Sequence, residues 1–279
     1  MAERRFAAVI GHPIAHSLSP AIFRELAAAA GIVLEYRALD VPQGELESTL
    51  VRFRNDPGFV GCNVTMPHKE RIVALLDRCT PAAQACVAVN VVRREGTQLL
   101  GDNTDVAGIE ATLRRLAFEP RGARAVIFGA GGGAHAVATV LGEAAASEVW
   151  IVTRSLERGR ILAERATARW PATAFAVLAL EREIPPPAEL YVNATPLGQS
   201  GQPSRELLPR NAPARAYAFD LVYRPAQTPF VRDAGARGMR AIGGFPMLLE
   251  QALATFERWF GFRPPLDSLA LSRLERLAA

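Results

Sequence analysis

The segment RAVIFGAGGGA, residues 124–134, decides the fold of the second half of this 279-residue chain. Its first five residues form an apolar run typical of a buried strand, and the glycines that follow match G-x-G-x-x-(G/A) ahead of an alanine-rich helical stretch. Gly129 permits a tight turn, Gly131 allows a pyrophosphate to approach closely, and Ala134 allows the helix to pack on the strand. The free N–H groups at the start of the helix would face the phosphates. We therefore expect a Rossmann-type, doubly wound dinucleotide-binding domain, with a glycine-rich turn that binds nothing as the alternative.

The edge of the next strand indicates which dinucleotide is bound. An acidic residue at this place would hold the ribose hydroxyls, whereas an arginine would meet a 2'-phosphate. The strand expected at residues 149–152 runs into Thr153, Arg154 and Ser155, with Arg158 one helical turn later and no acidic residue at that edge. Guanidinium groups bind phosphate through bidentate, charge-assisted hydrogen bonds. We expect NADP rather than NAD, although Arg158 alone is equally well explained as a solvated helix residue.

Apolar runs and stretches of helical spacing alternate on both sides of this segment. Such alternation predicts an α/β protein, with largely parallel sheets that carry helices on their faces. The expected strands cover residues 6–10, 33–39, 59–64 and 88–92, and then 124–128, 148–152, 190–193, 217–221 and 239–242. The expected helices include residues 21–30, 45–54, 70–77, 105–116, 247–260 and 266–277.

The order of these elements predicts two domains. The helix at 105–116 lies between the two series of strands and is expected to link them. The last two helices have no sheet of their own to follow, so we expect them to pack on the first domain and to clamp a cleft between the domains. The predicted division is an N-terminal α/β domain of residues 1–103, completed by residues 244–279, and a dinucleotide-binding domain of residues 104–243.

Composition and charge exclude several classes of protein. Apolar residues make up 49% of the chain, enough for real cores, but no apolar run reaches the length that a bilayer requires. The N-terminus lacks the long apolar centre of a signal peptide, and three cysteines without a C-x-x-C pair fit reduced thiols, so we expect a cytoplasmic protein. The net charge of +4 comes from scattered arginines, which argues against nucleic acid as a partner. The four histidines are dispersed, so we expect no metal site.

Lys69 is the only lysine among the 32 basic residues of the chain. A guanidinium keeps its proton near neutral pH, whereas a lysine ammonium can titrate when its surroundings shift its pKa. Lys69 is therefore a candidate for a role that needs a transferable proton, with chance as the alternative. We interpret His68 beside it as an exposed histidine at the start of a helix.

Four short motifs in the first domain combine hydroxyl, amide and charged side chains. They are HSLSP at 16–20, NVTMPHK at 63–69, VN at 89–90 and GDNTD at 101–105. Ser19 before Pro20 is typical of a helix N-cap, and Ser17 adds a second hydroxyl that could help to hold a carboxylate. Of Asp102 and Asp105, we expect one to cap the linking helix and the other to point at the ligand.

The second and third motifs are expected to line one cleft. Pro67 is expected to open a helix after the strand, which would let Asn63, Thr65 and Lys69 face the same side. Asn90, at the next strand, would place a further amide beside them. The set provides hydrogen-bonding groups and one titratable ammonium for a small polar ligand.

These four motifs, in this order, resemble those of the shikimate dehydrogenase family. The likeness continues through the glycine loop, the Asn193-Ala194-Thr195 segment, Tyr223 and Gln251, and so covers nearly the whole chain. It implies an NADPH-dependent, reversible reduction of 3-dehydroshikimate to shikimate, in the pathway through chorismate to the aromatic amino acids. The first domain would then bind the substrate and the second NADP. The family includes both monomers and homodimers, and both remain open here.

The resemblance also implies roles for individual residues. Lys69 and Asp105 are the implied catalytic pair. Hydride transfer to a ketone builds charge on the oxygen, so a positioned proton donor is needed, and Lys69 suits that role with Asp105 orienting it. The implied substrate-binding residues are Ser17, Ser19, Asn63, Thr65, Asn90, Tyr223 and Gln251. The implied cofactor-binding residues are Gly129, Ala130, Gly131, Gly132, Gly133, Ala134, Thr153, Arg154, Ser155, Arg158, Asn193, Ala194, Thr195, Leu221 and Gly244.

Two other functions remain open on the sequence. One is a dual quinate/shikimate dehydrogenase that uses NAD, against which Arg154 argues. The other is a non-catalytic, NADP-binding regulatory paralogue, because a fold does not by itself establish a function. The intact Lys69 and Asp105 argue against this second alternative. Departures from the usual family pattern, such as Phe23 and Val91, leave room for an altered substrate scope.

Overall fold

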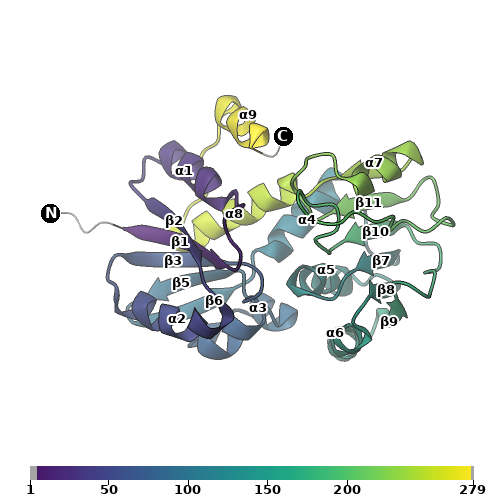
Figure 1. The fold of residues 1–279 in the computed structure, drawn as a ribbon, viewed down its shortest axis with the longest axis horizontal. Coiled ribbons are helices and arrows are strands. Elements are labelled where there is room, and N and C mark those ends of the chain that lie inside the picture. The colour runs from purple at the N-terminus through teal and green to yellow at the C-terminus, as the bar shows by residue number, and fades with distance from the viewer. Residues whose placement is uncertain (1–4, 278–279) are drawn as a thin grey trace. The chain divides into compact units, whose positions relative to one another are not determined.

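The computed structural model describes residues 5–277 as an α/β protein made of two compact units (Figure 1). The first unit contains residues 5–107 together with Leu249–Leu277, and the second contains Gly108–Leu248. Both crossings between the units fall inside helices, α4 (Asp105–Arg115) and α8 (Phe245–Phe260). The division expected from the sequence lies just before these same two helices. Each of the two helices therefore contributes residues to both units.

In the described part of the first unit, a six-stranded sheet has the order β2-β1-β3-β5-β6-β4. Its strands are β1 (Phe6–Gly11), β2 (Glu35–Asp40), β3 (Phe59–Val64), β4 (Arg78–Cys79), β5 (Val91–Glu95) and β6 (Gln98–Asp102). The helices are α1 (Ser19–Ala29), α2 (Leu46–Asn55), α3 (Pro81–Cys86), α9 (Ser268–Arg276) and the 3-10 helices η1 (Gln43–Glu45) and η2 (Arg71–Leu75). β1 pairs in parallel with β2 and β3, and β4 with β6, whereas β5 runs antiparallel to both neighbours. The mainly parallel sheet expected for this domain is confirmed.

Part of this unit differs from the elements expected from the sequence. β4, β6 and α3 have no counterpart among them, and the strand expected at 88–92 begins instead at Val91. Residues 70–77 were expected to form an α-helix, but only the shorter η2 forms there. Ile72 is buried in η2, and Val73, Leu75 and Leu76 pack against the same core, so the shorter helix already places the apolar side chains of this segment.

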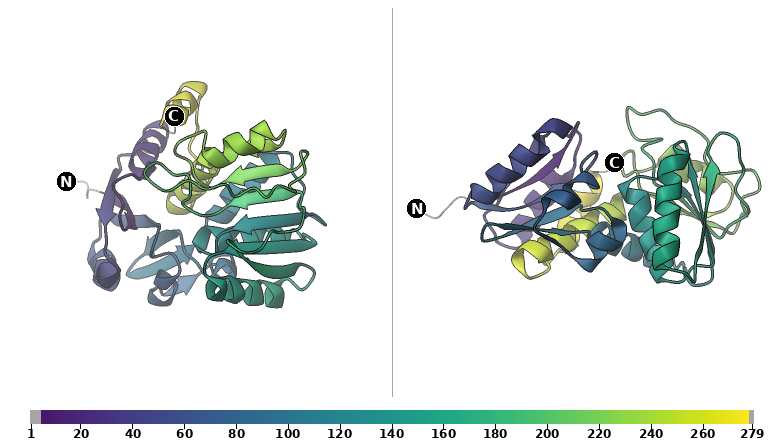
Figure 2. Two further views of the ribbon diagram at one scale, coloured as in Figure 1. Left: turned by 45° about the vertical axis from the view of Figure 1, so that its right-hand side comes forward. Right: turned by 90° about the horizontal axis from the view of Figure 1, so that it is seen from below.

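In the described part of the second unit, a six-stranded parallel sheet has the order β12-β11-β10-β7-β8-β9. Its strands, which Figure 2 shows side by side, are β7 (Arg124–Phe128), β8 (Glu148–Thr153), β9 (Ala174–Ala179), β10 (Leu190–Asn193), β11 (Tyr217–Asp220) and β12 (Arg240–Ile242). Its own helices are α5 (Gly132–Glu143), α6 (Leu156–Arg169) and α7 (Pro229–Ala236). The order reverses between β7 and β10, and open α/β sheets bind ligands at the carboxyl ends of the strands at such a point. The doubly wound fold expected around residues 124–134 is confirmed.

Each unit has an apolar core of its own. In the first, the rings of Phe53 and Phe59 stack with their centroids 4.1 Å apart, and in the second the fully buried Tyr191 belongs to a cluster of aliphatic and aromatic residues. Trp259 of α8 packs on the first unit, where its Nε1 donates to the carbonyl oxygen of Val92 at 3.0 Å and its ring lies 5.1 Å from that of Phe23. Burying a ring of this size contributes about 2–3 kcal/mol. The C-terminal half of α8 is therefore held firmly against the sheet of the first unit. Between residues 5 and 277, no helix is both long enough and apolar enough to cross a bilayer.

Candidate active site

Lys69 and Asp105 form an ion pair in the first unit, with 2.6 Å between Lys69 Nζ and Asp105 Oδ2. Lys69 lies in the turn that follows β3, and Asp105 is the first residue of α4. The side chain of Asp105 is 7% exposed and that of Lys69 is 19% exposed, so water reaches little of the pair. A charge-assisted hydrogen bond of this length holds both groups in one orientation. The structure thus brings together the two residues expected to be catalytic.

The amide of Asn90 orients the second oxygen of Asp105. Asn90 Nδ2 donates to Asp105 Oδ1 at 2.8 Å and, over a longer distance of 3.5 Å, to Gln251 Oε1. Asn90 Oδ1 accepts the backbone N–H of Thr104 at 2.7 Å, so both ends of the amide are used in a single orientation. All four residues are buried. Lys69 and Asn90, from two separate segments, therefore each contact the carboxylate of Asp105, and Gln251 joins them through Asn90.

Asn63, the second-last residue of β3, joins the same network through two residues that the sequence motifs do not mark. Tyr36 Oη donates to Asn63 Oδ1 at 2.8 Å, and Asn63 Nδ2 donates to Thr255 Oγ1 at 3.3 Å. Thr255 Oγ1 lies 3.1 Å from Thr104 Oγ1, which closes the network. Thr255 lies four residues after Gln251 on α8, and this helical spacing is the signal that could have identified it. Nothing in the local sequence distinguishes Tyr36.

Tyr36 is held in its protonated form. Burial raises the pKa of its hydroxyl well above the ordinary value, and the neighbouring Cys62 raises this pKa as well, whereas a hydrogen bond with Ser19 lowers it. Because the hydroxyl keeps its proton, it can donate to Asn63 throughout the physiological pH range. The contact with Ser19 also connects the start of α1 to the polar network.

The start of α1 differs from the expectation. Ser19 was expected as the N-cap, but Leu18 holds that position, and Ser19 is the first helical residue, followed by Pro20. Ser17 instead supplies the side-chain oxygen, since its Oγ accepts the backbone N–H of Ser19 at 3.3 Å. The prediction of the cap was wrong because proline is favourable at either of the first two helical positions, so the Ser-Pro pair does not fix the register. Ser19 is buried and Ser17 half-buried.

The turn after β3 also differs from the expectation. Pro67 does not open a helix: Met66–Pro67 is a cis peptide in a turn, and η2 begins only at Arg71. His68 is fully buried rather than exposed, because its Nε2 hydrogen-bonds to the carbonyl oxygen of Val41 at 2.7 Å. Its backbone N–H donates to the carbonyl oxygen of the half-buried Thr65 at 3.0 Å. This turn delivers Lys69 to Asp105.

An asparagine, rather than an acidic residue, binds the start of α4. Asn103 Oδ1 accepts the backbone N–H of Asp105 at 3.0 Å, and Asn103 Nδ2 donates to the carbonyl oxygen of Ala88 at 2.8 Å. Asp102, expected to be either the cap or the residue facing the ligand, accepts hydrogen bonds from Thr80 and Arg258 instead. The sequence could not separate the two acids because the partners of Asp102 come from distant segments.

In the second unit, the glycine loop connects β7 to α5 at the reversal of strand order. Gly129 has φ 112°, in the region that favours glycine, and a Cβ there would lie 2.9 Å from the carbonyl oxygen of Ala194. Gly131 is the N-cap of α5, and a Cβ built on it meets no atom within 4 Å. The free N–H groups and the open space at this helix N-terminus fit a pyrophosphate. The remaining residues of the loop and the first turn are Ala130, Gly132, Gly133 and Ala134.

The end of β8 places the residues expected to select the nucleotide. Thr153 Oγ1 accepts the backbone N–H of Ser155 at 3.2 Å, and Ser155 caps α6 by accepting the backbone N–H of Arg158 at 3.4 Å. Arg154 and Arg158 are exposed. The capped turn fixes the backbone here and leaves guanidinium groups at the surface, a donor set that fits a 2'-phosphate.

Asn193, at the end of β10, organises the loop opposite the glycines. Its Oδ1 accepts the backbone N–H of Thr195 at 3.0 Å and its Nδ2 donates to Asp220 Oδ1 at 2.9 Å. Asp220 was not among the expected site residues; it is fully buried, and Thr228 Oγ1 donates to its Oδ2 at 2.6 Å. Burial raises the pKa of Asp220 to about 6, although hydrogen bonds from Thr228, the Val222 backbone and Asn193 oppose this rise.

Leu221, Tyr223 and Gly244 also lie in the second unit. The backbone N–H of Leu221 donates to the carbonyl oxygen of Asn193 at 2.9 Å, and a Cβ on Gly244 would lie 2.3 Å from the carbonyl oxygen of Leu221. Tyr223 is half-buried in this unit, whereas Gln251 belongs to the first unit. The structure thus gathers the other expected substrate residues in one unit, and the expected cofactor residues, with Tyr223, in the other.

Two family models match the chain. One, described as the shikimate dehydrogenase substrate binding domain, matches residues 9–92, and the other, described as the shikimate 5'-dehydrogenase C-terminal domain, matches residues 244–268. The first match contains the turn that carries Lys69, and the second contains the part of α8 that carries Gln251 and Thr255.

Curated relatives and solved structures are similar over almost the full length. A shikimate dehydrogenase (NADP(+)) of Symbiobacterium thermophilum is 38% identical over 286 residues, covering 98% of this chain and 95% of the relative. One from Methylobacterium radiotolerans is 41% identical over 262 residues, covering 92% of this chain and 91% of the relative. The crystal structure of shikimate 5-dehydrogenase from Thermus thermophilus, in complex with NADP(H) and shikimate, is 37% identical with a TM-score of 0.82, covering 99% of this chain and 100% of that one.

Proposed function

The chain belongs to the shikimate dehydrogenase family, and from this membership we propose that it catalyses the NADPH-dependent, reversible reduction of 3-dehydroshikimate to shikimate. One observation carries the proposal within the structure. The only lysine of the chain pairs with a buried carboxylate at 2.6 Å, inside a cluster of amide and hydroxyl side chains. Such a cluster suits a small ligand that has several hydroxyls and one carbonyl to be protonated.

We propose that Lys69 gives a proton to the oxygen of the reacting ketone. Reduction of a carbonyl builds negative charge on its oxygen, and a positioned acid stabilises that charge by transferring a proton in the transition state. Asp105 holds the ammonium in place through Oδ2, while Asn90 holds Oδ1. Because the carboxylate is held at both oxygens, Lys69 meets its substrate in one fixed orientation. In the reverse direction the same amine accepts the proton of the substrate hydroxyl.

The substrate is a cyclic carboxylate with ring hydroxyls, and the first unit offers groups for each part. Hydroxyl groups at the start of α1 would hold the carboxylate, assisted by the positive end of the helix. The amides around Asp105 would hold the ring hydroxyls. The proposed substrate residues are Ser17, Ser19, Asn63, Thr65, Asn90, Tyr223 and Gln251, with Lys69 and Asp105 as the proposed catalytic pair.

NADPH would be held in the second unit and would supply the hydride. The backbone N–H groups at the start of α5 would bind the pyrophosphate, and Arg154 and Arg158 the 2'-phosphate. The other proposed cofactor residues are Gly129, Ala130, Gly131, Gly132, Gly133, Ala134, Thr153, Ser155, Asn193, Ala194, Thr195, Leu221 and Gly244. Two observations support this assignment: the open space at Gly131, and the end of β8, where Thr153 and Arg154 stand instead of an acidic residue.

The nicotinamide absorbance tests the proposal directly. The purified protein is mixed with shikimate and NADP, and separately with quinate and NAD. We expect rapid reduction of NADP by shikimate and much slower reaction of the second pair. Turnover of quinate with NAD at a comparable rate would assign the chain to the dual-specificity enzymes. Absence of turnover with every combination of these substrates and cofactors would overturn the proposal and favour a binding module.

We also propose that the enzyme works in the cytoplasm, as a monomer or a homodimer, with small molecules as its ligands. Cys62, Cys79 and Cys86 are not joined in disulfides in the structure, which fits a reducing compartment. Sedimentation of the purified chain at micromolar concentration distinguishes the monomer from the dimer.

A further inference from the structure

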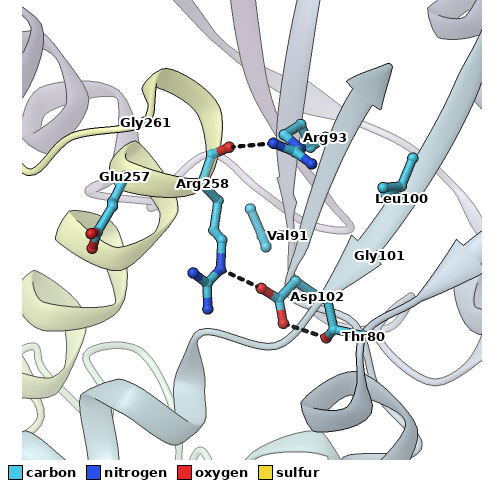
Figure 3. A pocket seen from close by; sticks show the side chains of 9 residues that line it. All are labelled: Thr80, Val91, Arg93, Leu100, Gly101, Asp102, Glu257, Arg258 and Gly261. Carbon is cyan, nitrogen blue, oxygen red and sulfur yellow. Dashed lines mark hydrogen bonds and ion pairs between the residues drawn. The ribbon is translucent and has the colours of Figure 1, made fainter. Parts of the chain in front are cut away.

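A cavity of about 390 Å³ opens in the first unit, and a buried carboxylate lies at its edge (Figure 3). The cavity is bordered by β5, β6, the cap of α3 and the last turns of α8. Figure 3 shows Asp102 between Arg258 and Thr80, with both side chains directed at its two oxygens. The proposed catalytic mechanism does not use this carboxylate.

Both carboxylate oxygens of Asp102 accept hydrogen bonds. Arg258 Nε donates to Oδ2 at 2.6 Å, and Oδ1 accepts from Thr80 Oγ1 at 2.5 Å and from the backbone N–H of Asn103 at 2.7 Å. The side chain of Asp102 is 10% exposed, whereas that of Arg258 is 57% exposed. An ion pair with one partner so exposed contributes little to stability, because water screens the attraction. The contacts of Asp102 are therefore better explained by the geometry that they impose.

The first consequence of this geometry lies along the chain. Asp102 Oδ1 accepts the backbone N–H of Asn103 and so fixes this residue. The side-chain Oδ1 of Asn103 in turn accepts the backbone N–H of Asp105. The backbone carbonyl of Asp102 accepts the N–H of Asn90 at 3.1 Å. Asn103, which holds the backbone of Asp105, and Asn90, which orients its carboxylate, are thus each connected to Asp102 within one step.

The second consequence concerns α8. Arg258 lies seven residues after Gln251 and three after Thr255, so the three side chains share one face of the helix. The bond from Arg258 to Asp102 fixes this face relative to β6. The position of Gln251 on this face is thereby fixed, and with it the amide that contacts Asn90.

We propose that Asp102 is a positioning residue for the reaction, which sets the Asp105 carboxylate through Asn103 and the Gln251 amide through Arg258. The inference rests on the proposed function, in which Asp105 and Gln251 meet the substrate. In this role Asp102 acts through its neighbours and not through a contact of its own with substrate or cofactor.

Steady-state kinetics of Asp102→Asn and Arg258→Ala test the inference. Because displacement of a catalytic group by a fraction of an ångström slows a reaction strongly, we expect kcat for shikimate oxidation to fall about tenfold or more in each variant. KM for NADP stays within about twofold, since the cofactor residues lie in the other unit. Arg273→Ala is the matched control: Arg273 also donates through Nε, to Glu25 at 2.8 Å in the same unit, and its loss leaves kcat unchanged.

Chemical rescue separates positioning from a merely structural role. Asp102 and Arg258 both line the cavity, so removing the Arg258 side chain leaves space beside Asp102 in which ethylguanidinium at millimolar concentration can replace the lost group. We expect it to restore most of kcat in Arg258→Ala, while sodium chloride at equal concentration does not. This measurement also decides the matter if Asp102→Asn does not fold.

The outcomes distinguish the two proposals. An active wild-type enzyme whose Asp102→Asn variant has the same kcat overturns the positioning role alone. A lower kcat that only follows the loss of folded protein in thermal melts, without rescue by ethylguanidinium, also overturns it. A wild-type protein that does not oxidise shikimate overturns the proposed function, and the positioning role with it.

Discussion

The ammonium of Lys69 lies 2.6 Å from a buried carboxylate, in a chain whose other basic residues are arginines. If it transfers the proton, Lys69→Ala lowers kcat about 100-fold or more, because general acid catalysis of this kind contributes at least that factor. KM for shikimate changes much less. Lys69→Arg keeps the charge and an ion pair with Asp105 but cannot give up a proton, so we expect a similar loss of kcat. Near-normal turnover in either variant, measured by steady-state kinetics, would remove Lys69 from the mechanism.

The exposed guanidinium of Arg154 is expected to select the nucleotide. Arg154→Asp removes a partner of the 2'-phosphate and adds a repulsive charge, so kcat/KM for NADP should fall by about tenfold or more relative to that for NAD. Arg160→Asp, at an exposed position on α6, is the control for the change in net charge. An unchanged ratio in Arg154→Asp would contradict the assignment.

Asp220 predicts a pH dependence of stability in the second unit. Burial raises its pKa from 3.8 to about 6, so the folded protein keeps a proton between these values that the unfolded chain has lost. The free energy of unfolding therefore falls by about 3 kcal/mol from this group as pH rises from about 4 to about 6. Above about pH 6 this group causes no further change. Asp220→Asn cannot titrate and should lack this fall in urea denaturation series. Glu164→Gln, an exposed carboxyl on α6, should keep it; a parallel fall in Asp220→Asn would refute the prediction.

Motifs marked most single residues of the site but not their contacts. Asn63, Asn90 and Asp105 are recognisable because they stand in short polar motifs next to strand and helix ends. Tyr36 and Thr255, which bond to them in space, lie in segments with no such motif. A hydrogen bond depends on short distances and suitable angles, and local sequence does not specify these for residues far apart along the chain.

The turn between β7 and α5 was the element best predicted, because its requirements are local. Gly129→Ala places a Cβ at φ 112° and 2.9 Å from a carbonyl oxygen, so it should lower the free energy of unfolding by about 2 kcal/mol. Gly131→Ala adds its methyl to open space, and should leave stability nearly unchanged while weakening NADP binding. Denaturant titration and fluorescence titration with NADPH measure the two effects. The opposite pattern would show that Gly131, rather than Gly129, is the structural glycine.

Other elements were predicted less well, and for a physical reason. The first turn of α1 begins one residue away from the expected cap, and the segment after Pro67 is a turn followed by a short 3-10 helix. Proline restricts the backbone without choosing between these local structures. Packing made the choice, since His68 enters the interior to reach Val41.

Each of the two ligands is expected to bind a different unit. The expected substrate residues other than Tyr223 belong to the first unit, and the cofactor loop to the second. In hydrogen exchange, shikimate alone should slow exchange at residues 63–69 and 102–105, and NADP alone at residues 129–134 and 153–158. Protection of 129–134 by shikimate alone, or of 63–69 by NADP alone, would contradict this division of binding.

The alternation of elements, the glycine loop and the polar motifs are properties of neighbouring residues, and the sequence alone therefore sufficed for the α/β class, the doubly wound second unit and the family. The partners of each side chain depended on tertiary structure. Gln251 and Asn90 are 161 positions apart, and only folding brings their amides together. The same holds for Asp102 and Asp105, which stand in the same short motif. Thr80 and Arg258 donate to Asp102, whereas Lys69 and Asn90 donate to Asp105. Contacts between distant segments arise only when the chain closes its core, and these contacts assign the roles.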